Sequence, residues 1–218
     1  SVFLLRQTLG ECDPAAAHCV ETVYGRGYRF VADVALESAS RERDERPPAV
    51  RALVLQGRAM LSRGSPRLAE AFAPFERAIA LDPGYAPALV GLAECHLAAA
   101  FNAAATVREA GGRARALLAD ALRLAPDDAR ALACRGVQAS LLDWDLPAAE
   151  RAFAQALAIA PSDSLVRWSQ GRHLLSIGRY DAAVEQLDFA AELAPGNLGV
   201  IMHRVFTKYF AGRSAAAL

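Results

Sequence analysis

Three prolines divide the second half of the chain at almost constant intervals. Pro126, Pro161 and Pro195 each follow an alanine-rich stretch, and successive ones stand 35 and 34 residues apart. Proline disrupts the interior of a helix, so each of them indicates that a helical segment has ended. A period of this length predicts a row of equivalent units that stack on their neighbours, and it argues against a single globular core.

Each unit is predicted to contain two helices. In residues 164–195, apolar residues recur three or four positions apart on both sides of Gly178, which is the spacing of one helix face. The first helix contains Gly171 and the second contains Leu187. A small residue inside a helix permits the close approach of another helix, so we expect the two helices to cross at Gly171.

The same residues recur one period earlier, where Gly136 stands in place of Gly171 and Phe153 in place of Leu187. A helix–turn–helix of about 34 residues with small residues at such positions resembles the tetratricopeptide repeat (TPR) family. The resemblance implies a mostly α-helical fold, a TPR-like α-solenoid in which the first helix of each repeat, helix A, faces a binding groove. About four and a half repeats are expected, with boundaries 49–83, 84–126, 127–161, 162–195 and a partial repeat 196–218.

Two repeats depart from the regular length. Pro83 and Pro126 are 43 residues apart, so the second repeat is longer than the others. We expect its extra residues in the turn between the two helices, around residues 101–112. The third repeat is also slightly longer, near Trp144, and we expect that side chain to anchor the turn.

Residues 1–34 do not follow the repeat. Leu5 and Leu9 have the spacing of a helix that ends at Gly10, and two short strand-like stretches follow, joined through residues 24–27. The two glycines of that joint permit a tight turn, so a short helix followed by a β-hairpin is predicted. Residues 35–48 alternate in charge and end in two prolines, which is typical of a linker.

The hairpin sequence resembles the wing of OmpR/PhoB-type winged-helix DNA-binding domains. In that family the wing contains Thr-Val, Gly and Gly-Tyr-Arg-Phe, and residues 22–30 contain these in the same order. The resemblance implies that residues 1–34 are the C-terminal part of a truncated winged-helix domain. The candidate DNA-binding residues are Arg6, Tyr24, Arg26 and Arg29.

Other features weaken DNA binding by this chain. The start of the recognition helix would precede Ser1, and residues 1–34 contain three arginines against four acidic residues, which is poor support for phosphate binding. The alternative role for Arg6 is an ion pair that ties the helix to the hairpin, and the alternative for Arg26 is a solvated turn residue without function. We therefore expect no specific DNA binding from these 218 residues alone.

The TPR resemblance also implies a partner-binding groove on the A helices. The candidates combine a basic stripe with aromatic side chains, a combination that suits a carboxylate or an acidic peptide. The alternatives are that the arginines are solvated and paired with acids such as Glu94, and that Trp168 is ordinary core between repeats. The candidate groove residues are Arg58, Glu94, Arg130, Trp168, Arg172, Phe206 and Tyr209.

Composition and motifs narrow the possible functions. Basic and acidic residues number 24 each, so bulk charge favours neither nucleic acid nor a membrane surface, and no apolar run approaches the length of a membrane span. The four cysteines form no CxxC pair, which favours free thiols in the cytoplasm. Nucleotide-binding, serine-hydrolase and zinc-protease motifs are missing, so no enzyme activity, metal or cofactor is expected.

These features together predict part of a bacterial, cytoplasmic transcriptional regulator, in which a DNA-binding winged helix is coupled to a TPR array. The expected partners are DNA for the full-length parent and a protein, peptide or small effector for the groove. The main alternative is a TPR scaffold for protein–protein interaction without DNA binding. A regulatory module fused to an enzyme is a third possibility, and all three rest on resemblance rather than on a site.

Overall fold

The chain divides into two compact units, Ser1–Glu45 and Arg46–Leu218. The computed structural model describes residues 20–23, 27–30, 47–63 and 68–212. None of the helices in these ranges combines the length and the apolar character needed to span a bilayer.

The described part of the first unit is a β-hairpin. Strands β1 (Val20–Val23) and β2 (Gly27–Phe30) pair antiparallel, with Thr22 opposite Tyr28. Two strands therefore lie where the sequence predicts them. The helix predicted to end at Gly10 lies outside the described residues.

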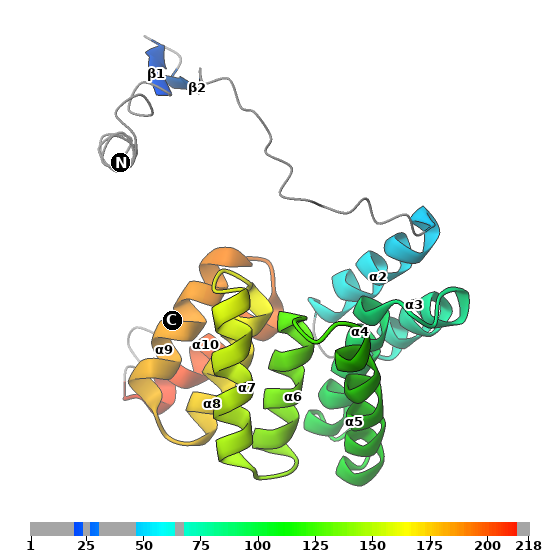
Figure 1. The fold of residues 1–218 in the computed structure, drawn as a ribbon. Coiled ribbons are helices and arrows are strands. Elements are labelled where there is room, and N and C mark those ends of the chain that lie inside the picture. Colours follow the sequence, from blue (N-terminus) through cyan, green and yellow to red (C-terminus); the bar gives the residue numbers. More distant parts are fainter. Residues whose placement is uncertain (1–19, 24–26, 31–46, 64–67, 213–218) are drawn as a thin grey trace. The chain divides into compact units, whose positions relative to one another are not determined.

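All described secondary structure in the second unit is helical, and it has the arrangement of a TPR-like solenoid (Figure 1). The first helix of each contacting pair is a helix A and the second a helix B. Within the described ranges the pairs are α2 (Pro48–Leu61) with α3 (Leu68–Leu81), α4 (Ala86–Phe101) with α5 (Val107–Leu124), α6 (Ala129–Leu141) with α7 (Leu146–Ile159), and α8 (Ser164–Ser176) with α9 (Tyr180–Leu193), followed by α10 (Leu198–Phe210).

Three A helices begin at a side-chain cap that recurs with the repeat. Asp128, Asp163 and Asn197 each stand two residues after a repeat proline, and each side chain accepts hydrogen bonds from two backbone N–H groups in the first helical turn. These N–H groups have no partner within the helix, so the cap satisfies them. It fixes where α6, α8 and α10 begin.

The predicted close crossing at Gly171, and the equivalent crossing one repeat earlier at Gly136, are confirmed. A Cβ added to Gly136 would lie 2.8 Å from the ring of Phe153, and one added to Gly171 would lie 2.6 Å from Leu187. Phe153 and Leu187 are fully buried. The B-helix side chain therefore packs directly against the A-helix backbone, which only glycine allows at this separation. At the end of α8, Gly178 has a φ of +77°, as suits a glycine that ends a helix.

The extra residues of the second repeat lengthen its helices, so the expected insertion in the turn is wrong. Helix α4 has 16 residues and α5 has 18, whereas the other described helices have 13 or 14. Helix α5 begins at a capping box: the Glu109 N–H donates to Thr106 Oγ1 (3.3 Å), and the Thr106 hydroxyl donates to Glu109 Oε2 (2.9 Å). Phe101 is the last residue of the longer α4.

The expectation that Trp144 anchors its turn is also wrong. Its side chain is 80% exposed, and its φ is +57°, which is unusual for a bulky residue. Backbone hydrogen bonds close the turn instead, because the Asp145 N–H donates to the Ala139 carbonyl at 2.9 Å and the Asp143 N–H donates to the Gln138 carbonyl at 3.1 Å.

A pair of glycine substitutions tests the close helix crossing. Gly136→Ala adds a methyl group where the Phe153 ring already lies, so we expect a loss of about 1–3 kcal/mol in the free energy of unfolding. Gly112→Ala in α5 meets no atom within 4 Å, so we expect a gain of up to about 1 kcal/mol from helix propensity. Urea unfolding followed by circular dichroism measures both, and equal or greater stability of Gly136→Ala would contradict the packing described.

Candidate binding site on the A-helix wall

The A helices contact one another in order along the array. Helix α4 contacts α2 and α6, and α8 contacts α6 and α10. We call this continuous layer, formed by α2, α4, α6, α8 and α10, the A-helix wall. The array also curls back on itself, because the Leu198 N–H at the start of α10 donates to the Ser62 carbonyl at the end of α2 (3.1 Å).

A buried carboxylate lies in the middle of the wall. Burial raises the pKa of Glu94, and the positive charges of Arg130 and Arg58 only partly oppose that effect. Its Oε1 atom is buried and has no hydrogen-bond partner in the described structure. Arg130 and Arg58 therefore attract Glu94 electrostatically, but the close ion pair considered in the sequence analysis does not form.

The arginines of the predicted basic stripe do not share one environment. Arg130 donates from Nε to Asp163 Oδ2 at 2.9 Å, in a half-buried ion pair that joins α6 to the start of α8. Asp163 also caps α8, so this pair ties two repeats together. The Arg130 guanidinium therefore already has an anionic partner inside the protein.

Arg172 is held between two aromatic rings. Its guanidinium carbon lies 4.6 Å from the ring centre of Phe101 and 5.3 Å from that of Trp168. It has no hydrogen bond or ion pair with any other described residue, and burial lowers the pKa of Arg172 to about 10. Such a cation is attracted to the ring faces, yet it lacks the anion that would normally accompany a buried charge.

The buried polar side-chain atoms without a partner in the described structure have one feature in common. All of them belong to A helices α2, α4 and α8, and none belongs to a B helix or a turn. Buried polar atoms are satisfied in most native structures, so a cluster of exceptions calls for an explanation. The atoms are Arg58 Nε, Glu94 Oε1, Trp168 Nε1, Gln170 Oε1, Arg172 Nε and His173 Nε2.

Helix α10 ends the described wall with an apolar surface. Phe206 is 48% exposed and Tyr209 is 63% exposed, and Met202 on the same helix is exposed as well. The two aromatic candidates of α10 are therefore open to contact, whereas Trp168 is half-buried against Gly199 and the ring of His203.

His203 joins three helices of the wall. Its ring lies 5.6 Å from the ring of Trp168 and 5.8 Å from that of Phe101. Burial and the nearby charge of Arg172 lower the pKa of His203 to about 4, although the hydrogen bond from Nδ1 to the Gly199 carbonyl acts in the opposite direction. The imidazole is neutral at pH 7.

The candidate DNA-binding residues belong to the first unit. Arg6, Tyr24 and Arg26 lie outside the described residues, and Arg29 lies on β2 opposite Glu21. The described ranges contain no group of three or more His, Cys, Asp or Glu side chains that could hold a metal ion.

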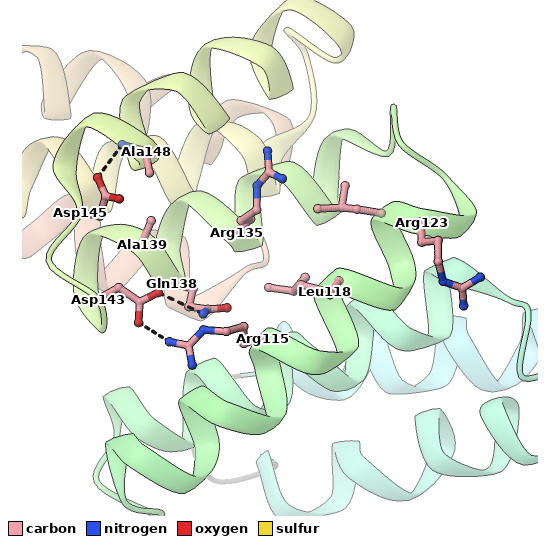
Figure 2. Close-up of a pocket in the computed structure, with 11 residues that line it drawn as sticks. Arg115, Leu118, Arg123, Arg135, Gln138, Ala139, Asp143, Asp145 and Ala148 are labelled. Atoms are coloured by element: carbon pink, nitrogen blue, oxygen red, sulfur yellow. Dashed lines mark hydrogen bonds and ion pairs between the residues drawn. The ribbon is translucent and has the colours of Figure 1, made fainter.

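A second hollow lies away from the wall, and the sequence analysis missed it. Its lining residues come from α5, α6 and the start of α7 (Figure 2). The hollow has a volume of about 570 Å³. Arg115 and Gln138 both donate to the carboxylate of Asp143, at 2.5 Å and 3.2 Å. No sequence period marks these residues, because they come together only when one repeat packs on the next.

The arrangement of helices is similar to that of several solved structures, among them a TPR protein. TTC0263, a thermophilic TPR protein of Thermus thermophilus, is 28% identical over 76% of this chain and 84% of its own, with a TM-score of 0.56. PilW, a type IV pilus biogenesis factor, is 18% identical over 79% of this chain and 74% of its own, with a TM-score of 0.52.

A third similar structure belongs to a larger chain. IFIT1, solved as a monomeric mutant with m7Gppp-AAAA, is 21% identical with a TM-score of 0.59, over 73% of this chain and 34% of that one. The matched region thus spans about a third of that chain. No family model and no curated protein sequence matches the chain. The similarities show a TPR-like fold and give no support to the winged-helix prediction.

The low pKa of His203 predicts a specific pH dependence. The unfolded state binds a proton near pH 6.5 and the folded state only near pH 4, so stability falls as pH drops through this window. We expect His203→Phe, which keeps a ring beside Trp168, to reduce that loss by about 1–3 kcal/mol. Urea unfolding at pH 7 and pH 4 measures the difference, and identical pH dependence in the two proteins would refute the assignment.

Proposed function

We propose that residues 46–218 form a protein-interaction module whose A-helix wall binds a segment of a partner protein. The observation that supports this proposal is the clustering of unpartnered buried polar atoms on α2, α4 and α8. A buried polar group without a partner costs about 1–3 kcal/mol. Concentration of that cost on one layer of helices is expected if a guest supplies the missing partners.

The side chains of the wall indicate the chemistry of the guest. Arg172 lacks an anion among the described residues, and its planar guanidinium matches a carboxylate. Phe206 and Tyr209 expose rings on the neighbouring helix α10, and aromatic side chains are frequent anchors at interfaces. A peptide with an acidic residue followed by apolar residues therefore suits the wall.

The similar structures are compatible with more than one kind of guest. A TPR-like fold presents a helical wall whose ligand is decided by its side chains rather than by the fold. IFIT1 was solved with the capped ligand m7Gppp-AAAA, so a nucleic-acid guest provides a useful competitor in a test. The neutral overall charge of this chain favours the peptide.

Charge reversal on the wall tests the proposed function. Twelve-residue peptides would be selected from a random display library on the full chain, and their binding measured by fluorescence anisotropy. We expect selected peptides to combine acidic with apolar residues, and Arg172→Glu to weaken them by about tenfold or more. Tyr209→Ala should weaken them by about three- to tenfold.

The matched control is Arg151→Glu, which reverses an exposed charge on B helix α7. Its affinity should equal that of the unchanged protein. Selected peptides without acidic residues, or equal effects of Arg151→Glu and Arg172→Glu, would show that the wall is not the binding surface.

The DNA-binding regulator remains a second proposal, supported by the hairpin. The strands pair Thr22 with Tyr28, in the segment whose sequence resembles a wing. Because residues 1–34 contain three arginines against four acidic residues, which is poor support for phosphate binding, we expect no sequence-specific DNA binding by residues 1–218. A gel-shift assay with a random-sequence duplex pool, followed by sequencing of retained DNA, checks this, and an enriched motif would prove the expectation wrong.

A further inference from the structure

The hollow in Figure 2 lies on a different side of the array from the A-helix wall. Its α6 residues are Arg135, Gln138 and Ala139, whereas the wall candidate of that helix is Arg130. At 3.6 residues per turn, Arg135 and Ala139 lie on the opposite side of α6 from Arg130. A ligand in this hollow would therefore not contact Arg172 or α10.

The base of the hollow is apolar and already shaped by the fold. The hollow is lined by Leu118 and Leu122 of α5 and by Ala139 of α6. Leu118 is buried in the core between the repeats, so its position is fixed by packing. A volume of about 570 Å³ lies within the range of ligand sites and would hold a few apolar side chains. Burial of such side chains is the main source of affinity available here.

The acidic residues that line the hollow already accept hydrogen bonds from other residues of the protein. The Asp143 carboxylate accepts hydrogen bonds from Arg115 and Gln138, and the Asp145 carboxylate accepts one from the Ala148 N–H and so caps α7. Arg115 therefore offsets the charge of Asp143, whereas Asp145 keeps its negative charge. Arg123 and Arg135 outnumber it, so the net charge of the lining residues is positive.

Two arginines supply that basic charge. Arg135 is exposed and has no hydrogen bond or ion pair with another described residue, and Arg123 has only a 3.5 Å contact with Asp120 one helical turn away. Exposed pairs of that kind contribute little. Both guanidinium groups are free to bind carboxylates of another molecule.

An exposed aromatic residue separates two of the lining residues in the chain. Trp144 lies in the chain between Asp143 and Asp145, both of which line the hollow. It is 80% exposed and its backbone is in the left-handed region, at a φ of +57°. A non-glycine residue in that region costs about 1–3 kcal/mol, and such strain is concentrated at functional positions. Exposed tryptophan is also among the residues most often found to dominate an interface.

From these observations we infer that the hollow between α5, α6 and α7 is a second docking site, which binds an acidic, amphipathic segment of a partner protein. Apolar side chains of the segment enter the hollow, its carboxylates bind Arg123 and Arg135, and Trp144 packs along its edge. The site is separate from the A-helix wall, so the chain would bridge two partners.

A peptide titration tests the docking site. The probe is a synthetic helical peptide with leucines on one face and glutamates beside them, added to the full ¹⁵N-labelled chain. We expect amide shifts in residues 115–148, and about tenfold weaker binding in the double variant Arg123→Glu/Arg135→Glu. Trp144→Ala should weaken binding without lowering the melting temperature, because its side chain is exposed and its backbone strained.

Three controls make the test decisive. Arg151→Glu on α7 and Arg172→Glu on the wall should leave this binding unchanged, which separates it from the proposed function. A peptide with lysine in place of glutamate should not bind. The inference fails if the lysine peptide binds equally well, if the shifts map to α2, α4, α8 and α10 instead, if no shift occurs, or if a single-stranded oligonucleotide displaces the peptide and binds more tightly.

Discussion

The contact between a B-helix side chain and an A-helix glycine is the interaction on which the array depends. Phe75, Phe153 and Leu187 are fully buried against Gly57, Gly136 and Gly171 respectively. Because glycine has no Cβ, the two helix backbones of these three pairs approach closely. The other sides of each A helix are then available to its neighbours, and 12 of the 16 residues of α4 are buried. A continuous wall of A helices follows from this crossing.

A wall packed this closely changes the chemistry of the polar groups within it. Burial opposes charge on Glu94, Arg172 and His203 alike, and it moves each pKa toward the neutral form. The Arg130–Asp163 pair is satisfied inside the fold, whereas Arg172 has only the faces of two rings. Unpaired groups of this kind do not stabilise a protein by themselves, and their occurrence on the A helices is the basis of the proposed binding function.

Most of the architecture could be predicted from short-range sequence signals. The two wrong predictions also concern short segments. The proline period and the glycines predicted the helix pairs and their crossings, because these depend on residues within one repeat. The extra length of the second repeat was misplaced, since a proline-to-proline distance does not say whether added residues extend a helix or a turn. The capping box of Thr106 and Glu109 was the signal that would have decided it. For Trp144, an aromatic residue in a turn suggested an anchor, but backbone hydrogen bonds close that turn instead.

The sequence by itself determined that this chain forms paired helices in a repeating array, and on which helices the candidate side chains lie, because helix periodicity and capping are short-range properties. Tertiary structure alone decided which candidates are paired, stacked or exposed. Arg130 meets Asp163 from the next repeat, and Arg172 meets Phe101 only because α4 is long. The hollow lined by Arg135 likewise exists only between repeats. Such contacts depend on how each repeat is rotated against the previous one, and that rotation results from packing along the whole array rather than from spacing within any segment.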